Sequence, residues 1–198
     1  MSPANVQRFW KWFADNAERL ANYTPEHLNL TNEIRDALRR LHQPDKYSGG
    51  GPSLSFEIHP HGGGHEFIVS ASGIASAFHL AQKLVAAAPA LLDWKFTALI
   101  PRKPVEQVLA DLKFGADDVW FKFAEAGGKA NIVVFINNLS ASSEHDPTAV
   151  RPFLLYILGE ETFGTKVDTF DCQRLPPDPQ NWGLKPLKLL PETVDALS

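Results

Sequence analysis

The chain has 198 residues, of which 44% are hydrophobic and 21% charged, an ordinary globular usage that excludes disordered and fibrous proteins. The 19 basic and 23 acidic residues are interspersed and give a net charge of −4, so no nucleic-acid partner is expected, because phosphate binding needs a basic surface. No stretch reaches the roughly 20 apolar residues that span a bilayer, so no membrane partner is expected either.

The first segment, residues 1–45, is predicted to form a helical pair. Its first half has one apolar stripe at spacings of three and four: Val6, Phe9, Trp10, Phe13, Ala17 and Leu20. We expect this stripe to lie in the core. A second helix is predicted from Thr24-Pro25, where a capping residue precedes a proline at the first helical position, and it should end before Pro44.

The next segment, residues 53–101, is predicted to form a first ββαβ unit. Leu54, Phe56 and Ile58 alternate with polar residues, as in a half-buried strand. The stretch "EFIVSA" beyond a glycine turn supplies the second strand of a hairpin. Ser72 can cap a helix after this hairpin, and "DWKFTALIP" alternates like a third strand.

Residues 118–173 repeat this order and are predicted to form a second ββαβ unit. A hairpin is expected from "DVWFKFAE", the turn "AGGK" and "NIVVFINN". Asp146-Pro147 predicts the start of a helix, and "TKVDTFDC" supplies a sixth strand. The shared order indicates an internal duplication with a pseudo-twofold relation between the hairpins, which should then share one sheet. The alternative is two unrelated segments with the same order of elements.

The last segment, residues 176–198, is rich in proline, which disfavours helix and central strand. It also carries large apolar residues: Trp182, Leu184, Leu187, Leu189 and Leu190. We therefore expect an ordered arm, anchored by Trp182, that lies on the body of this subunit or of a neighbour.

Together these elements predict an α+β fold in a single domain, residues 1–198. We expect a six-stranded mixed or antiparallel sheet built from the two ββαβ units. Helices should cover one face of this sheet, and the N-terminal helical pair should complete the domain.

Three phrases of the sequence, "FWKWF", "FEIHP…EFIVSASG" and "LVAAAPALLDWKF", resemble a family of small bacterial proteins of uncharacterised function. The likeness extends over most of the chain. It implies a bacterial origin and a single compact fold. It implies no activity, because the shared phrases are strand cores, a cap and a helix stripe.

The stretch "HPHGGGH" is the local feature that most suggests a chemical site. His59 and His61 can point from one face of a strand, with Glu57 on the same face and His65 across the turn, a donor set that suits a metal ion. Against this, Pro60 interrupts the strand, and the second glycine turn has no histidine. The favoured prediction is an exposed hairpin tip without metal or cofactor.

Other chemical motifs are weaker. The glycine runs lack the strand, glycine loop and helix context of a phosphate-binding loop. Ser72 does not lie in a nucleophile elbow, and Cys172, the only cysteine, has no local sign of activation. Trp12 and Trp120 each lie opposite the apolar stripe of their element, so they are predicted to be exposed contact residues.

We therefore expect a cytoplasmic binding or protein-interaction module without catalytic chemistry. A single cysteine suits a reducing compartment, and the N-terminus lacks the apolar core of a signal peptide. The partner would be a protein or a small molecule, and a homodimer is one form of such an assembly. The alternative is a metal-assisted hydrolase, or another small enzyme, that uses His59, His61 and His65.

Overall fold

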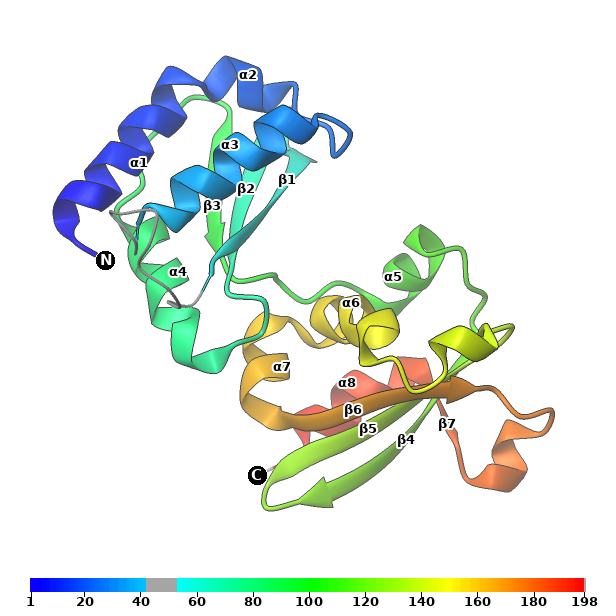
Figure 1. The fold of residues 1–198 in the computed structure, drawn as a ribbon. Coiled ribbons are helices and arrows are strands. Elements are labelled where there is room, and N and C mark those ends of the chain that lie inside the picture. The colour runs from blue at the N-terminus through cyan, green and yellow to red at the C-terminus, as the bar shows by residue number, and fades with distance from the viewer. Residues whose placement is uncertain (42–52, 198) are drawn as a thin grey trace. The chain divides into compact units, whose positions relative to one another are not determined.

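The computed structural model describes residues 1–41 and 53–197, in which the chain forms two compact units (Figure 1). Unit 1 is Met1–Ile100, with strand order β1-β2-β3, and unit 2 is Pro101–Ser198, with order β6-β5-β4-β7. The α+β class is confirmed, whereas the single six-stranded sheet is wrong. Residue alternation identifies strands, but it does not determine which strand edges pair. The single domain stays a prediction.

Unit 1 begins with three helices: α1 (Pro3–Asp15), α2 (Ala17–Ala21) and α3 (Leu28–Arg39). The Ser2 hydroxyl caps α1 by accepting a hydrogen bond from the Asn5 N–H at 3.2 Å. The predicted start of the second helix at Thr24-Pro25 is wrong, because Pro25 lies in a turn and α3 begins only at Leu28. Residues 42–45 of the predicted helical pair lie outside the described residues.

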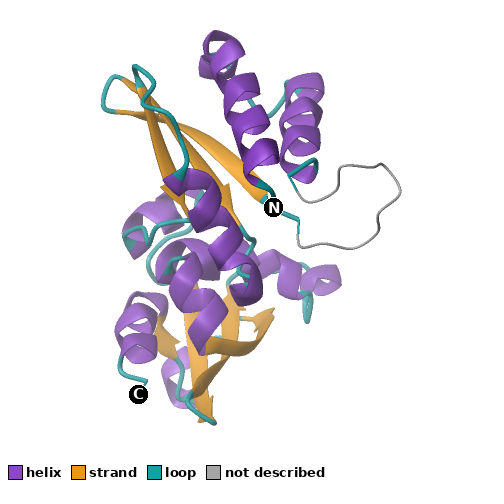
Figure 2. Cartoon of the chain, turned by 90° about the vertical axis from the view of Figure 1, so that its left-hand side faces the viewer, coloured by secondary structure: helices purple, strands orange, loops and turns teal. Residues whose placement is uncertain are grey.

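The sheet of unit 1 consists of β1 (Ser55–His61), β2 (Gly64–Ser70) and β3 (Trp94–Ala98), with α4 (Phe78–Ala86) between β2 and β3. β2 pairs with β1 antiparallel and with β3 parallel. The predicted cap Ser72 is wrong. It has a left-handed backbone with φ of 56°, and a 3-10 turn separates it from α4. In Figure 2 the helices and the sheet of this unit lie in separate layers.

The core of unit 1 lies between this sheet and its helices. Phe9 and Phe13 are 3% and 0% exposed, which confirms them as core residues. The Phe13 ring lies 4.9 Å from the ring of Phe67 on β2. The Trp10 indole N–H donates to the Leu84 carbonyl at 2.9 Å and thereby links α1 to α4. All three helices α1, α3 and α4 contribute to this cluster, so they pack on the same face of the sheet.

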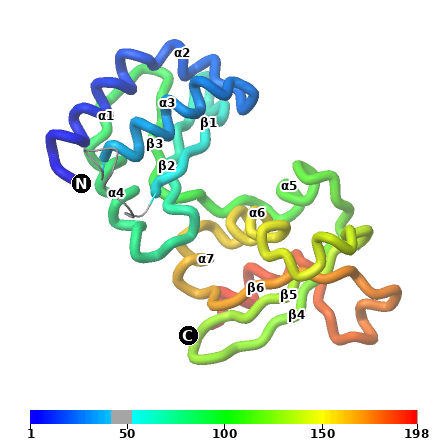
Figure 3. Tube along the Cα trace, in the orientation of Figure 1, coloured from blue at the N-terminus to red at the C-terminus, as the bar shows by residue number. Residues whose placement is uncertain are grey.

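Unit 2 has a sheet of four strands: β4 (Val119–Ala126), β5 (Lys129–Ile136), β6 (Val167–Arg174) and β7 (Lys185–Pro186). Its helices are α5 (Val105–Asp111), α6 (Pro147–Leu158), α7 (Glu160–Lys166) and α8 (Leu190–Asp195). The predicted start at Asp146-Pro147 is confirmed, because the Asp146 carboxylate accepts a hydrogen bond from the Thr148 N–H at 2.9 Å. Figure 3 follows the chain from α6 through α7 into β6.

The two units share a topology of hairpin, crossover helices and a third strand parallel to the second. Each hairpin turns through two glycines with positive φ, Gly62-Gly63 and Gly127-Gly128. The two hairpins nevertheless lie in separate sheets, so the predicted pseudo-twofold pairing within one sheet is wrong. The two units share this topology, but the predicted duplication required one shared sheet and is wrong on that test.

The proline-rich tail is ordered and packs on unit 2. β7 pairs with β4, with Pro186 opposite Trp120, and Leu187 and Leu190 are fully buried. The predicted anchor Trp182 is wrong, because its side chain is 65% exposed. Gly183 adopts a left-handed conformation after the 3-10 turn and redirects the chain, so the next residues enter the core instead.

Candidate functional site

The three histidines of the β1–β2 hairpin do not converge. Strand pairing places His59 opposite Glu66 and His65 opposite Pro60, so His65 lies on the face opposite to His59 and His61. The His65 ring lies 5.2 Å from the ring of Trp94. Within residues 1–41 and 53–197, no group of three histidine, cysteine or acidic side chains could hold a metal ion.

The other face of this hairpin carries a polar network. Two carboxylates on this face are each paired with a basic side chain. His59 Nε2 lies 2.6 Å from Glu57 Oε2, and Lys95 Nζ lies 2.8 Å from Glu66 Oε1. The Thr97 hydroxyl also donates to Glu66. Burial raises the pKa of the Glu66 carboxyl, but the hydrogen bonds from Lys95 and Thr97 outweigh it and lower the pKa below its ordinary value. A carboxylate held ionised in this way is a poor general acid or base near neutral pH.

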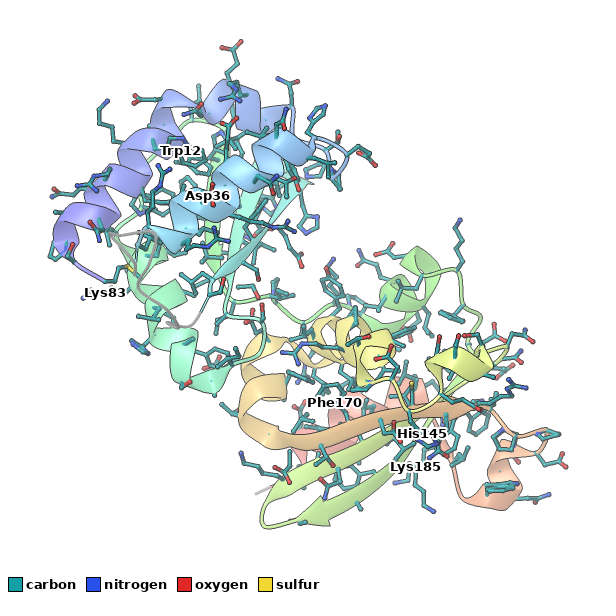
Figure 4. All side chains as sticks on the ribbon, viewed as in Figure 1. Trp12, Asp36, Lys83, His145, Phe170 and Lys185 are labelled. Atoms are coloured by element: carbon teal, nitrogen blue, oxygen red, sulfur yellow. The ribbon has the colours of Figure 1, made fainter. Side chains whose placement is uncertain are left out.

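Cys172 does not form a nucleophilic site. Its buried thiol donates to the carbonyls of Ser143 at 3.0 Å and Asp146 at 3.2 Å, and burial raises its pKa. The ring of His145, beside β6 in Figure 4, is engaged by Asp171, with Nδ1 and Oδ2 at 2.7 Å. A reactive cysteine needs thiolate character and access, and Cys172 has neither.

A groove between α1 and α3 is a better candidate for a binding site than the histidine hairpin or Cys172. The helices run antiparallel, since Asn5 Nδ2 donates to the Leu41 carbonyl at 3.4 Å at one end. At the other end Arg19, on α2 directly after α1, pairs with Glu33 at 3.2 Å. Figures 1 and 2 show these helices side by side. Between them lies a cavity of about 230 Å³. Its lining consists of Asn5, Arg8, Phe9, Trp12, Glu33, Asp36, Ala37 and Arg40.

The lining follows directly from helix geometry. On each helix the four residues have the spacing i, i+3, i+4, i+7, which places them on one face. Phe9 is buried and forms the floor, whereas Trp12 is half-buried with its ring 6.0 Å from that of Phe9. Figure 4 shows Trp12 on α1 and Asp36 on α3 at neighbouring positions along the two helices.

The charges in this groove are not balanced. Glu33 pairs with Arg19, and Asp36 pairs with Arg39 at 2.7 Å, so the two acids are neutralised by arginines outside the lining. Arg8 and Arg40 have no acidic partner in the described part of the chain. Two uncompensated guanidinium groups therefore flank an aromatic floor in a protein of net negative charge.

The two tryptophans that were predicted to be contact residues differ. Trp12 is half-buried and lines the groove, and its role as a contact residue stays a prediction. The predicted exposure of Trp120 is wrong, because it is only 7% exposed and packs with Phe135 and Leu184. The tail covers that face of the sheet, which the local pattern of β4 does not reveal.

A second cavity, of about 390 Å³, lies in unit 2 between α5, α6 and the end of β5. Its floor includes Phe114 and Phe153, and its rim includes Lys113 and Asp118. The Asp118 carboxylate is already occupied by hydrogen bonds from the Gly115 N–H and the Asn137 amide. This cavity thus offers a single cation, and its chemistry is less specific than that of the α1–α3 groove.

Comparison with protein-family models, with curated proteins and with solved structures gave no match to this chain. In the described ranges no helix has the length and apolar character needed to cross a bilayer. The arginines of the groove were missed by the sequence reasoning. Their spacing is visible in the sequence, but it becomes informative only once α1 and α3 are known to face each other.

Proposed function

We propose that this chain is a non-catalytic binding module that holds a small organic anion in the groove between α1 and α3. The observation that carries the proposal is the pair Arg8 and Arg40, which has no acidic partner among the described residues and flanks a concave aromatic surface. A cytoplasmic setting fits the buried, unpaired thiol of Cys172, because free thiols persist in a reducing compartment.

Arginine suits this role because its planar guanidinium presents several N–H donors in a fork that matches a carboxylate or phosphate. A hydrogen bond to a charged group contributes about 1.5–3 kcal/mol, compared with about 0–1 kcal/mol for an exposed ion pair. Arg8 and Arg40 are exposed, so two such contacts contribute at most about 3–6 kcal/mol, which corresponds to a dissociation constant between several millimolar and several tens of micromolar. The affinity of an unoptimised probe should therefore be measurable but weak.

A metal-assisted hydrolase has less support. Its donor set required His65 to join His59 and His61, and His65 lies on the opposite face of the hairpin. The carboxylate of that donor set, Glu57, is engaged by His59, with Oε2 and Nε2 at 2.6 Å. That enzymatic alternative stays a prediction, and metal analysis of untagged protein tests it.

Binding is tested by titration calorimetry of the full chain with small carboxylates and phosphate esters, alongside neutral amides of the same size. Arg8→Gln and Arg40→Gln should each weaken anion binding at least tenfold. Arg35→Gln is the matched control, because it removes the same charge from α3 outside the groove lining. If no anion binds, or if all three variants have the same effect, the proposed function is wrong.

A further inference from the structure

Building on the proposed function, we infer that the anion is a one-ring aromatic acid, a carboxylate or phosphate carried by a single aromatic ring. The arginines account for the acidic group. The aromatic ring of the ligand is inferred from Trp12, whose half-buried side chain lines the groove beside the buried Phe9, and the size of the ligand is inferred from the volume of the groove.

The half-buried side chain of Trp12 offers a surface to which an aromatic ligand can bind. Trp12 and Phe9 are tilted by 44° at 6.0 Å, and aromatic rings associate favourably at about 4.5–7 Å in such arrangements. The indole N–H groups of Trp10 and Trp120 both donate to backbone carbonyls at 2.9 Å. The indole N–H of Trp12 has no acceptor in residues 1–41 and 53–197, so it is available to a ligand.

The volume of the groove suits a ligand with one ring. Sites for drug-sized molecules measure about 300–1,000 Å³, and the groove is smaller, at about 230 Å³. A cavity of about 150 Å³ accommodates benzene. The remaining space suits one acidic group, whereas a fused two-ring system would project out of the groove.

The order of residues along the groove matches such a ligand. Because the helices are antiparallel, Arg8 and Arg40 lie toward one end, and Trp12 and Glu33 lie toward the other. Arg8 and Trp12 are separated by one helical turn, a rise of about 6 Å, which is the length of a ring with its acidic group. Glu33 at the ring end is paired with Arg19, so a second anionic group at the far side of the ring would find no uncompensated cation there.

The inference is tested by calorimetry on the full chain with benzoate and phenyl phosphate as probes. We expect each to bind at least tenfold more tightly than acetate or inorganic phosphate, and the tighter of the two identifies the preferred acid. Benzoate should also bind more tightly than cyclohexanecarboxylate, which has the same charge without the aromatic ring. Naphthoate should be weakened by its size, and terephthalate by its second carboxylate.

Variants of Trp12 distinguish this inference from the proposed function. Trp12→Leu should lose at least tenfold in benzoate affinity, whereas Trp12→Phe should retain most of it, and Trp182→Leu, an exposed tryptophan in unit 2, should match the parent. Thermal melts check that each variant is folded. If cyclohexanecarboxylate binds as well as benzoate and Trp12→Leu has no effect, the ring preference is wrong while the anion site stands. If Arg8→Gln leaves benzoate binding intact, the proposed function itself fails.

Discussion

Arg102 and Asp195 form a bidentate ion pair in unit 2, with both N–O distances at 2.7 Å. The pair ties the chain before α5 to the end of α8. The hydrogen bond from Arg102 holds the pKa of the Asp195 carboxyl below its ordinary value, although burial opposes the shift. The pair therefore stabilises the protein above the ordinary pKa of aspartate. This contribution is lost as the pH falls through the lowered folded-state pKa.

Asp195→Asn should lower the free energy of unfolding by about 0.2–1 kcal/mol at neutral pH, a small effect because both side chains are more than one third exposed. The difference from the parent should shrink as the pH becomes acidic. Urea denaturation across this pH range measures it. Asp168→Asn, at an exposed residue of β6, is the control and should change little. If the loss of unfolding free energy in Asp195→Asn does not change with pH, the ion pair is not its cause.

Phe13→Ala should lower the free energy of unfolding by about 3–5 kcal/mol, because a fully buried ring is lost and a cavity remains. The denaturant midpoint should fall accordingly. Leu92→Ala is the matched control, since Leu92 is 88% exposed and its loss should change stability by less than about 0.5 kcal/mol. Equal midpoints for the two variants would exclude Phe13 from the core.

Leu187→Ala should destabilise the protein by about 2–5 kcal/mol, because Leu187 anchors the tail in the core of unit 2. Trp182→Ala should have almost no effect on the melting temperature, since its ring is exposed. A larger loss for Trp182 than for Leu187 would reverse this assignment and restore the tryptophan as the anchor.

Gly64→Ala should destabilise unit 1 by about 1–3 kcal/mol. A Cβ atom at Gly64 would overlap the backbone carbonyl of Asp93, which also accepts a hydrogen bond from the His65 N–H at 2.7 Å. Gly115→Ala is a milder control, because its new Cβ would meet only the side chain of Asp118. Chemical denaturation compares the two, and a tolerated Gly64→Ala would show that the backbone of Asp93 does not restrict this position.

Patterns within single elements were sufficient to predict much of the fold. The stripe with Phe9 and Phe13 is the core face of α1, the hairpins turn at their glycines, and Asp146 caps α6. These features depend on helical and strand periodicity and on cap chemistry, which act over a few residues. The same locality explains the failures at Thr24-Pro25 and Ser72, where residues typical of caps lie in other backbone conformations.

Tertiary structure decided the placement of the histidines and the existence of the groove. A three-residue turn through all three glycines would put His65 on the face of His59, whereas the observed two-residue turn puts it on the opposite face. The sequence admits both turns. In the fold, the start of β2 is fixed by Asp93, whose backbone lies against Gly64 and accepts a hydrogen bond from the His65 N–H. Arg8 and Arg40 likewise face one cavity only because α1 packs antiparallel to α3, a long-range contact that no local spacing encodes.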